Sequence, residues 1–189
     1  MINENMYKQF CIGDMDPKGI TIHNTNNELS AVENYELMLQ SEYSYSAHFF
    51  IDEKDVIQAI PIDKACCHTG KGYDPGNLYT IAIEICSRGT GEEWQKALKN
   101  TMDTIEYLRS KTGKNLKIYF HRDFNPTVYC PHRILNEYGS KINFMKRSGL
   151  IDDSSNDGQQ RRHQSETGRR IVSPIRWIYN LWNTERNRK

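Results

Sequence analysis

Three polar side chains stand where predicted strands end or a helix begins, and together they could bind a metal ion. His23 follows the β-branched run 20–22, His121 follows the run 118–120, and Cys130 stands at the entrance to a helix. Strand ends present side chains to a common rim. Two imidazoles and a thiolate leave a fourth position on Zn²⁺ for water, as in catalytic zinc sites. On spacing alone, ordinary hydrogen-bonded histidines are the competing interpretation.

The backbone favours the same chemistry at Cys130. A Pro-His-Arg-Ile-Leu run follows this cysteine, and a proline at the first helical position predicts a short helix there. The dipole of a helix N-terminus favours a thiolate, the form of cysteine that binds metal.

One carboxylate interrupts an otherwise apolar stretch. Residues 79–86 read Tyr-Thr-Ile-Ala-Ile-Glu-Ile-Cys, which is typical of a central strand buried on both faces. Burying a carboxylate is costly unless it is paired or neutral, so Glu84 requires an explanation. One explanation is a structural ion pair with a buried Arg or Lys. We favour the other, in which Glu84 is a catalytic group.

Strand and helix patterns alternate around these residues. Ser30 and Glu33 form a predicted capping box before a helix of about ten residues. Apolar residues recur at three- and four-residue steps over 92–111, which predicts a long helix ending before Gly113. The predicted strands cover residues 19–23, 47–51, 56–60, 79–86 and 116–120. The fold class is therefore α/β, with a mixed central β-sheet flanked by helices.

The composition changes near residue 150. Residues 1–150 form the predicted catalytic domain, and residues 151–170 are polar enough to be a linker. Residues 171–189 form a short cationic, aromatic tail with apolar residues at helical offsets. Three interpretations of this tail stay open: a helix docked on the domain, a cationic helix that contacts an anionic polymer or membrane, or a remnant without a role.

Charge and hydropathy exclude several classes of protein. The chain has 25 Lys+Arg and 24 Asp+Glu, so no broad electrostatic field attracts nucleic acid, and we expect no nucleic-acid partner. The sequence has no apolar run of about 18 residues and no signal-peptide pattern at its start, which predicts synthesis in the cytoplasm. The five irregularly spaced cysteines indicate neither a disulfide framework nor a cysteine-rich zinc finger.

Five motifs occur in a characteristic order along the chain. They lie at residues 20–25 (Ile-Thr-Ile-His-Asn-Thr), 46–52 (Ser-Ala-His-Phe-Phe-Ile-Asp), 67–72 (Cys-His-Thr-Gly-Lys-Gly), 77–86, and 121–127 running into 130–135. This series resembles the type-2 N-acetylmuramoyl-L-alanine amidases, a family that includes phage endolysins, bacterial autolysins and peptidoglycan recognition proteins. The similarity covers roughly residues 15 to 140.

The resemblance implies a function and a site. The expected reaction is hydrolysis of the amide between N-acetylmuramic acid and L-alanine in bacterial peptidoglycan, with zinc held by His23, His121 and Cys130. Glu84 would transfer the proton, while Asn24 and His68 would contact substrate. Action on the cell wall would follow release during host lysis or non-classical export.

Two departures from the family pattern concern catalysis. Many members place a Lys or Thr two residues before the ligand Cys, but this chain has Val128 there, and Thr127 stands one residue earlier as the candidate replacement. Family members with a catalytic Tyr have it where this chain has Ala47, so Glu84 would carry the proton transfers. The alternative function is a non-catalytic muropeptide-binding protein, and a metal-free regulator that binds another protein is a third.

Overall fold

The computed structural model describes residues 4–41, 46–70, 72–151 and 176–178. The strands are β1 (Cys11–Asp14), β2 (Gly19–Asn24), β3 (Phe49–Ile51), β4 (Asp55–Gln58), β5 (Lys64–Cys66), β6 (Thr80–Ile85), β7 (Lys117–Phe120) and β8 (Arg176–Ile178). The helices are α1 (Glu4–Tyr7), the 3-10 helix η1 (Lys8–Phe10), α2 (Ala31–Gln40), α3 (Pro75–Tyr79), α4 (Glu92–Thr112), α5 (His121–Phe124), α6 (His132–Tyr138) and α7 (Lys141–Arg147).

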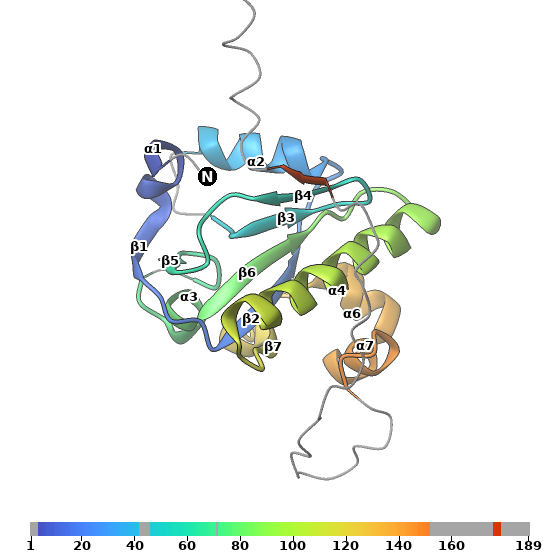
Figure 1. The fold of residues 1–189 in the computed structure, drawn as a ribbon. Helices are drawn as coiled ribbons and strands as arrows, with labels where there is room; N and C mark the ends of the chain where they lie inside the picture. Colours follow the sequence, from blue (N-terminus) through green and yellow to red (C-terminus); the bar gives the residue numbers. More distant parts are fainter. Residues whose placement is uncertain (1–3, 42–45, 71, 152–175, 179–189) are drawn as a thin grey trace, which may run out of the picture.

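A mixed six-stranded sheet forms the centre of the molecule (Figure 1). Its order is β7-β2-β6-β3-β4-β8. Strands β7, β2, β6 and β3 are parallel to one another, whereas β4 is antiparallel to β3. Strands β1 and β5 form a separate antiparallel pair. The predicted class, a mixed sheet flanked by helices, is confirmed.

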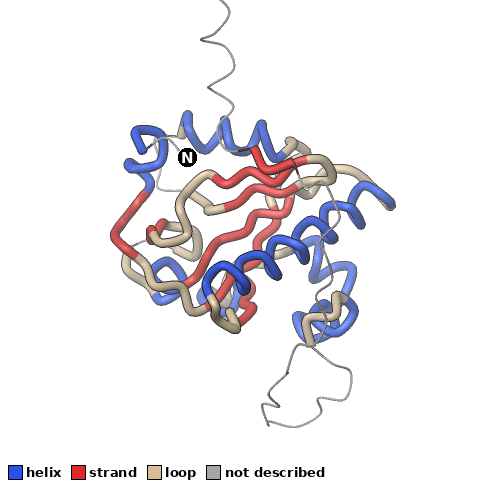
Figure 2. The backbone as a smooth tube through the Cα atoms, in the orientation of Figure 1, coloured by secondary structure: helices blue, strands red, loops and turns tan. Residues whose placement is uncertain are grey.

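The sheet separates two apolar cores, and helices cover both of its sides (Figure 2). On one side Ile81, Ile83 and Ile85 of β6 pack in the same core as residues of α4, α6 and α7. On the other side Ala82 and Cys86 pack with α2. Because side chains alternate along a strand, Glu84 shares the α2 side with these smaller residues.

Most predicted elements are confirmed, with small shifts at their ends. The capping box of α2 forms between Ser30 and Glu33. Helix α4 ends at Thr112, and Gly113 is its C-cap, with a left-handed φ of 65° that suits glycine. Strand β6 is buried along its whole length, as expected for a central strand. Pro131 occupies the N-cap of α6 rather than its first turn, so this helix begins one residue later than predicted.

The tail differs from its predicted helix where the structure describes it. Residues 176–178 form β8, which pairs in parallel with β4. A strand satisfies the backbone groups along the edge of β4, which a helix cannot do. The predicted linker beyond residue 151, and the tail residues 171–175 and 179–189, lie outside the described residues. Among the helices that are described, none is long and apolar enough to cross a membrane.

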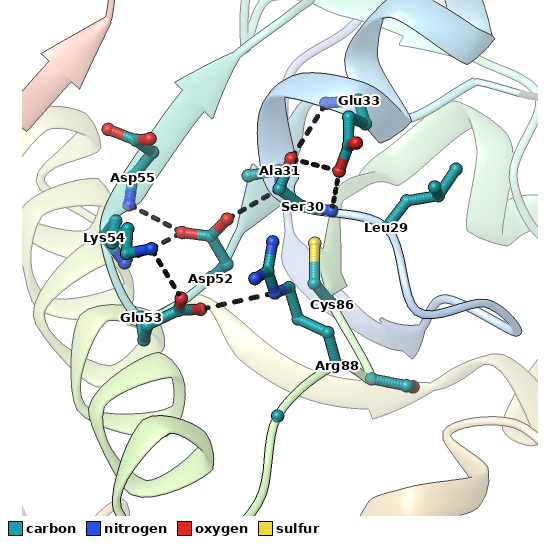
Figure 3. A network of polar contacts seen from close by, with 12 residues as sticks. Leu29, Ser30, Ala31, Glu33, Asp52, Glu53, Lys54, Asp55, Cys86 and Arg88 are labelled. Carbon is teal, nitrogen blue, oxygen red and sulfur yellow. Dashed lines mark hydrogen bonds and ion pairs between the residues drawn. The ribbon is translucent and has the colours of Figure 1, made fainter.

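A buried carboxylate holds the start of α2 against the turn between β3 and β4 (Figure 3). Asp52 is 2% exposed, and its Oδ1 accepts hydrogen bonds from the backbone N–H groups of Lys54 and Asp55 at 2.8 and 2.7 Å. Its Oδ2 accepts from the N–H of Ala31 at 2.8 Å. Asp52 therefore satisfies a first-turn amide of α2 that has no partner within the helix.

We expect Asp52→Ala to lower the free energy of unfolding by about 2–3 kcal/mol, because it removes the acceptor of three backbone N–H groups, one of them the buried N–H of Ala31. Ser30→Ala removes only the exposed cap of the same helix and should cost about 1 kcal/mol. Urea denaturation of both variants compares the two sites. Equal losses would show that Asp52 contributes no more than an ordinary cap.

Candidate active site

The register of three parallel strands brings three predicted site residues together. His23 of β2 lies opposite Glu84 of β6. On the other flank of β2, Ile22 lies opposite Phe120, so His121 follows directly at the end of β7. The rings of His23 and His121 are 4.8 Å apart between centroids. The carboxyl ends of β2, β6 and β7 thus form one edge of the site.

Cys130 reaches this edge from the segment that precedes α6. Its Sγ lies 3.8 Å from Nδ1 of His23. One potential ligand atom from each of His23, His121 and Cys130 lies within 4.8 Å of the others. Asn24 holds α6 in place, because its Oδ1 accepts from the N–H groups of Arg133 and Ile134 at 3.1 and 3.2 Å. The three predicted metal ligands therefore converge.

Hydrogen bonds at the outer nitrogens determine which atoms of the histidines face the cluster. His68 Nε2 lies 3.3 Å from the carbonyl oxygen of Thr80, which can only accept, so this nitrogen carries the proton. In the neutral ring Nδ1 of His68 is then an acceptor, and Nε2–H of His23 donates to it at 3.1 Å. His121 Nε2 lies 3.1 Å from the carbonyl oxygen of Thr69 and donates in the same way. Both candidate ligands keep the Nδ1 lone pair for a metal.

Burial sets the charge of the cluster. Burial lowers the pKa of His23 well below its usual value, and the neighbouring rings of His68 and His121 lower it further. Burial also lowers the pKa of His121, so both imidazoles are in the neutral form that binds metal. Burial, reinforced by the charge of Glu84, raises the pKa of Cys130 to about 12. In the metal-free protein, burial therefore raises the pKa of Cys130, whereas the sequence predicted that a helix N-terminus would favour its thiolate.

The donor set fits a zinc ion. A divalent cation would reverse the preference of Cys130, because its charge favours the thiolate. Two neutral imidazoles and one thiolate are a recognised set of three protein ligands for a zinc site that keeps an open position.

Glu84 lies beside this cluster and is buried. It is 3% exposed, and its Oε1 lies 3.9 Å from Nδ1 of His23. The imidazole of His23 is thus a direct neighbour of this carboxylate, and the alternative of a structural ion pair for Glu84 stays a prediction. The carboxylate is placed to exchange a proton with a group bound next to His23.

The cluster contributes to the lining of two adjacent hollows of the surface. One, of about 300 Å³, extends from His23 and Glu84 toward Asn34 and Leu37 of α2. The other, of about 590 Å³, extends toward Tyr129 and the start of α6. Asn24, Asn26, His121 and Cys130 line both. A substrate that continues on both sides of its reacting bond can therefore pass over the cluster.

Asn24 and His68 both line the surface hollows, but each already has partners within the protein. Asn24 lines both hollows, while its Nδ2 donates to the carbonyl of Ile85 at 3.2 Å. His68 lines the smaller hollow, and burial lowers its pKa to about 3. Their contact with substrate stays a prediction, and the structure adds a positioning role for each.

Thr127 is not brought to the cluster. It is exposed, it lines neither hollow, and its hydroxyl donates to Oδ1 of Asn125 at 2.6 Å. Val128, the residue after it, lines the larger hollow instead. The catalytic role of Thr127 stays a prediction that requires the hydroxyl to leave Asn125.

Arg133, to which the sequence analysis assigned no role, stabilises the helix that follows Cys130. Its Nη1 donates to the carbonyls of Ser87, Arg88 and Gly89 at 2.6, 3.1 and 2.8 Å. Its guanidinium lies 4.2 Å from the ring centroid of Trp94. Arg133 thus ties α6 to the loop after β6. Its place in the motif that contains Cys130 was the only sequence signal.

Comparison with known proteins agrees with this geometry. The family model described as N-acetylmuramoyl-L-alanine amidase matches residues 13–133. The chain belongs to this family. It is similar to the N-acetylmuramoyl-L-alanine amidases XlyB and CwlA of Bacillus subtilis (strain 168), with 35% and 36% identity over 140 residues. The match covers 72% of this chain but 44% and 51% of those relatives, so the chain spans about half of their length.

Solved structures of high similarity support the same family. PlyL superposes with a TM-score of 0.69 at 32% identity, covering 78% of this chain and 92% of PlyL. The catalytic domain of PlyG superposes with a TM-score of 0.70 at 29% identity, covering 84% of this chain and 96% of that domain. This chain of the amidase family therefore has the fold of PlyL and of the PlyG catalytic domain.

We expect Cys130→Ala to reduce bound zinc from roughly one ion per chain to a small fraction, because two neutral imidazoles alone bind zinc weakly. Cys11→Ala, a cysteine of β1 outside the cluster, is the matched control. Elemental analysis after dialysis measures the metal. Full zinc content in the Cys130 variant would overturn the assignment of this ligand.

Proposed function

We propose that the chain hydrolyses the amide between N-acetylmuramic acid and L-alanine in bacterial peptidoglycan, with zinc held by His23, His121 and Cys130. The observation that carries the proposal is the convergence of these residues, with the Glu84 carboxylate 3.9 Å from His23, in a chain of the amidase family. The names of the relatives XlyB and CwlA state the same activity.

The residues of the chain divide the chemistry between them. Zinc at this site would supply a Lewis acid that polarises the scissile carbonyl and lowers the pKa of water. Glu84 would take a proton from the attacking water as the new C–O bond forms. It would return that proton to the L-alanine nitrogen as the C–N bond breaks. Its burial keeps this proton from exchanging freely with solvent.

The two hollows support a substrate that extends in both directions. In peptidoglycan a glycan strand continues on one side of the scissile amide and a stem peptide on the other. Asn24 lies between the hollows, and His68 lines the smaller one. We propose both as residues that face the substrate near the reacting bond.

Action on the cell wall follows from the substrate. Among the similar solved structures, one is titled a mutant endolysin from Bacillus subtilis, with 29% identity and a TM-score of 0.61. The alternative function is a non-catalytic muropeptide-binding protein. Such a protein needs neither metal ligands nor a buried carboxylate beside them, so the cluster of His23, His121 and Cys130 next to Glu84 favours hydrolysis. Contact of the tail with wall polymer or membrane stays a prediction.

We expect Glu84→Gln to keep zinc and fold but to lower kcat on the order of 10²-fold or more, because the amide cannot exchange the proton. The measurement is the release of new L-alanine amino termini from purified cell walls, with and without a chelator.

Glu92→Gln, at the exposed start of α4, is the matched control and should leave the rate unchanged. An unchanged rate in Glu84→Gln would assign proton transfer to another group. Bound zinc without any release by the wild-type chain would favour the binding-protein alternative.

A further inference from the structure

Both histidines of the candidate zinc site donate their outer N–H group to the same short loop. Nε2 of His23 bonds to the imidazole of His68 at 3.1 Å. Nε2 of His121 bonds to the carbonyl oxygen of Thr69 at 3.1 Å. His68 and Thr69 are adjacent in sequence and buried. The orientation of both rings therefore depends on where one loop between β5 and α3 lies.

One buried carboxamide holds this loop. Asn77 of α3 is 0% exposed, and its Oδ1 accepts from the backbone N–H groups of His68 and Thr69 at 2.8 and 2.9 Å. Its Nδ2 donates to the carbonyls of Gly70 and Gly72 at 3.2 and 2.9 Å. An amide side chain fits this position because its oxygen accepts hydrogen bonds while its nitrogen donates them, whereas a carboxylate cannot donate.

The packing between loop and helix is tight at the same place. A Cβ atom on Gly76 would lie 2.3 Å from Oγ1 of Thr69, so the loop approaches α3 too closely for any side chain there. The Thr69 hydroxyl also donates to Asp74, the N-cap of α3, at 2.6 Å. The loop therefore has one position relative to α3, set by contacts that are independent of any metal.

We propose that Asn77 is a positioning residue of the zinc site, acting through His68 and Thr69, the loop residues that fix the outer nitrogens of His23 and His121. The inference rests on the proposed zinc site. By holding His68 and Thr69 in place, Asn77 keeps both imidazoles in the tautomer that presents Nδ1 to the metal. Outer hydrogen-bond partners of this kind change metal affinity by about 10- to 100-fold when they are removed.

The test compares the wild-type chain with Asn77→Ala and Asn77→Asp. We expect both variants to bind zinc about 10- to 100-fold more weakly, measured by competition with a chelator of known affinity. The Co²⁺-loaded variants should show a changed visible spectrum, because their imidazoles are less well oriented. Asn100→Ala is the matched control, since its amide bonds the carbonyl of Asp52 and touches neither the loop nor the site.

A second measurement does not require metal. Nitrogen-15 NMR of the metal-free protein reports the tautomer of each histidine, and His23 and His121 should be Nε2–H in the wild type but mixed in Asn77→Ala. If wild type binds no zinc, the zinc-based proposed function fails, and the tautomers alone still decide whether Asn77 positions the rings.

The inference is overturned if folded Asn77→Ala binds zinc within about threefold of wild type and keeps the Co²⁺ spectrum and both tautomers. If Asn77→Ala does not fold, two other variants decide. His68→Ala removes only the partner of His23, and Gly76→Ala displaces Thr69. Weaker zinc binding in both supports the positioning role, and wild-type affinity in both overturns it.

Discussion

The parallel register of β7, β2 and β6 is the constraint on which the site depends. It places His121, His23 and Glu84 side by side at the carboxyl ends of three adjacent strands. A shift of one residue in β2 would turn His23 toward the core beneath α4, since successive side chains point to opposite faces. The apolar residues of these strands fix the register, because Ile20 and Ile22 pack in that core. Core packing and site geometry are thus specified together.

Burial then decides the chemical state of the site. The imidazoles are neutral and the thiol of Cys130 is protonated in the metal-free protein, because the surroundings disfavour charge. The same surroundings strengthen the interaction of a thiolate and a carboxylate with a divalent cation. Zinc bound at this site would therefore offset the cost of placing these polar groups in an otherwise apolar sheet.

Helices on the two sides of the sheet have different tasks. Helix α4 covers the side that carries the larger apolar residues and contributes none of the residues that line the two hollows. Helix α2 covers the other side and contributes Asn34 and Leu37 to the smaller hollow. The Asp52 carboxylate and the capping box both hold the start of α2. They therefore help to shape the smaller hollow as well as to stabilise the fold.

Local patterns in the sequence determined the elements and the identity of the principal site residues. Strand and helix periodicity, the Ser30 cap and Gly113 are properties of neighbouring residues, so they can be read without a structure. The anomaly of Glu84 in an apolar strand is equally local. The ordered motifs then indicated the candidate metal ligands through resemblance to a family.

Tertiary structure alone decided how those residues are held. The bond between His23 and His68 joins positions 45 apart in sequence, and that between His121 and Thr69 joins positions 52 apart. Tertiary contacts also decided that Thr127 lies away from the cluster and that residues 176–178 form a strand, because both depend on which distant segments become neighbours. No local pattern encodes such contacts, because they arise from the packing of the whole sheet and its loops.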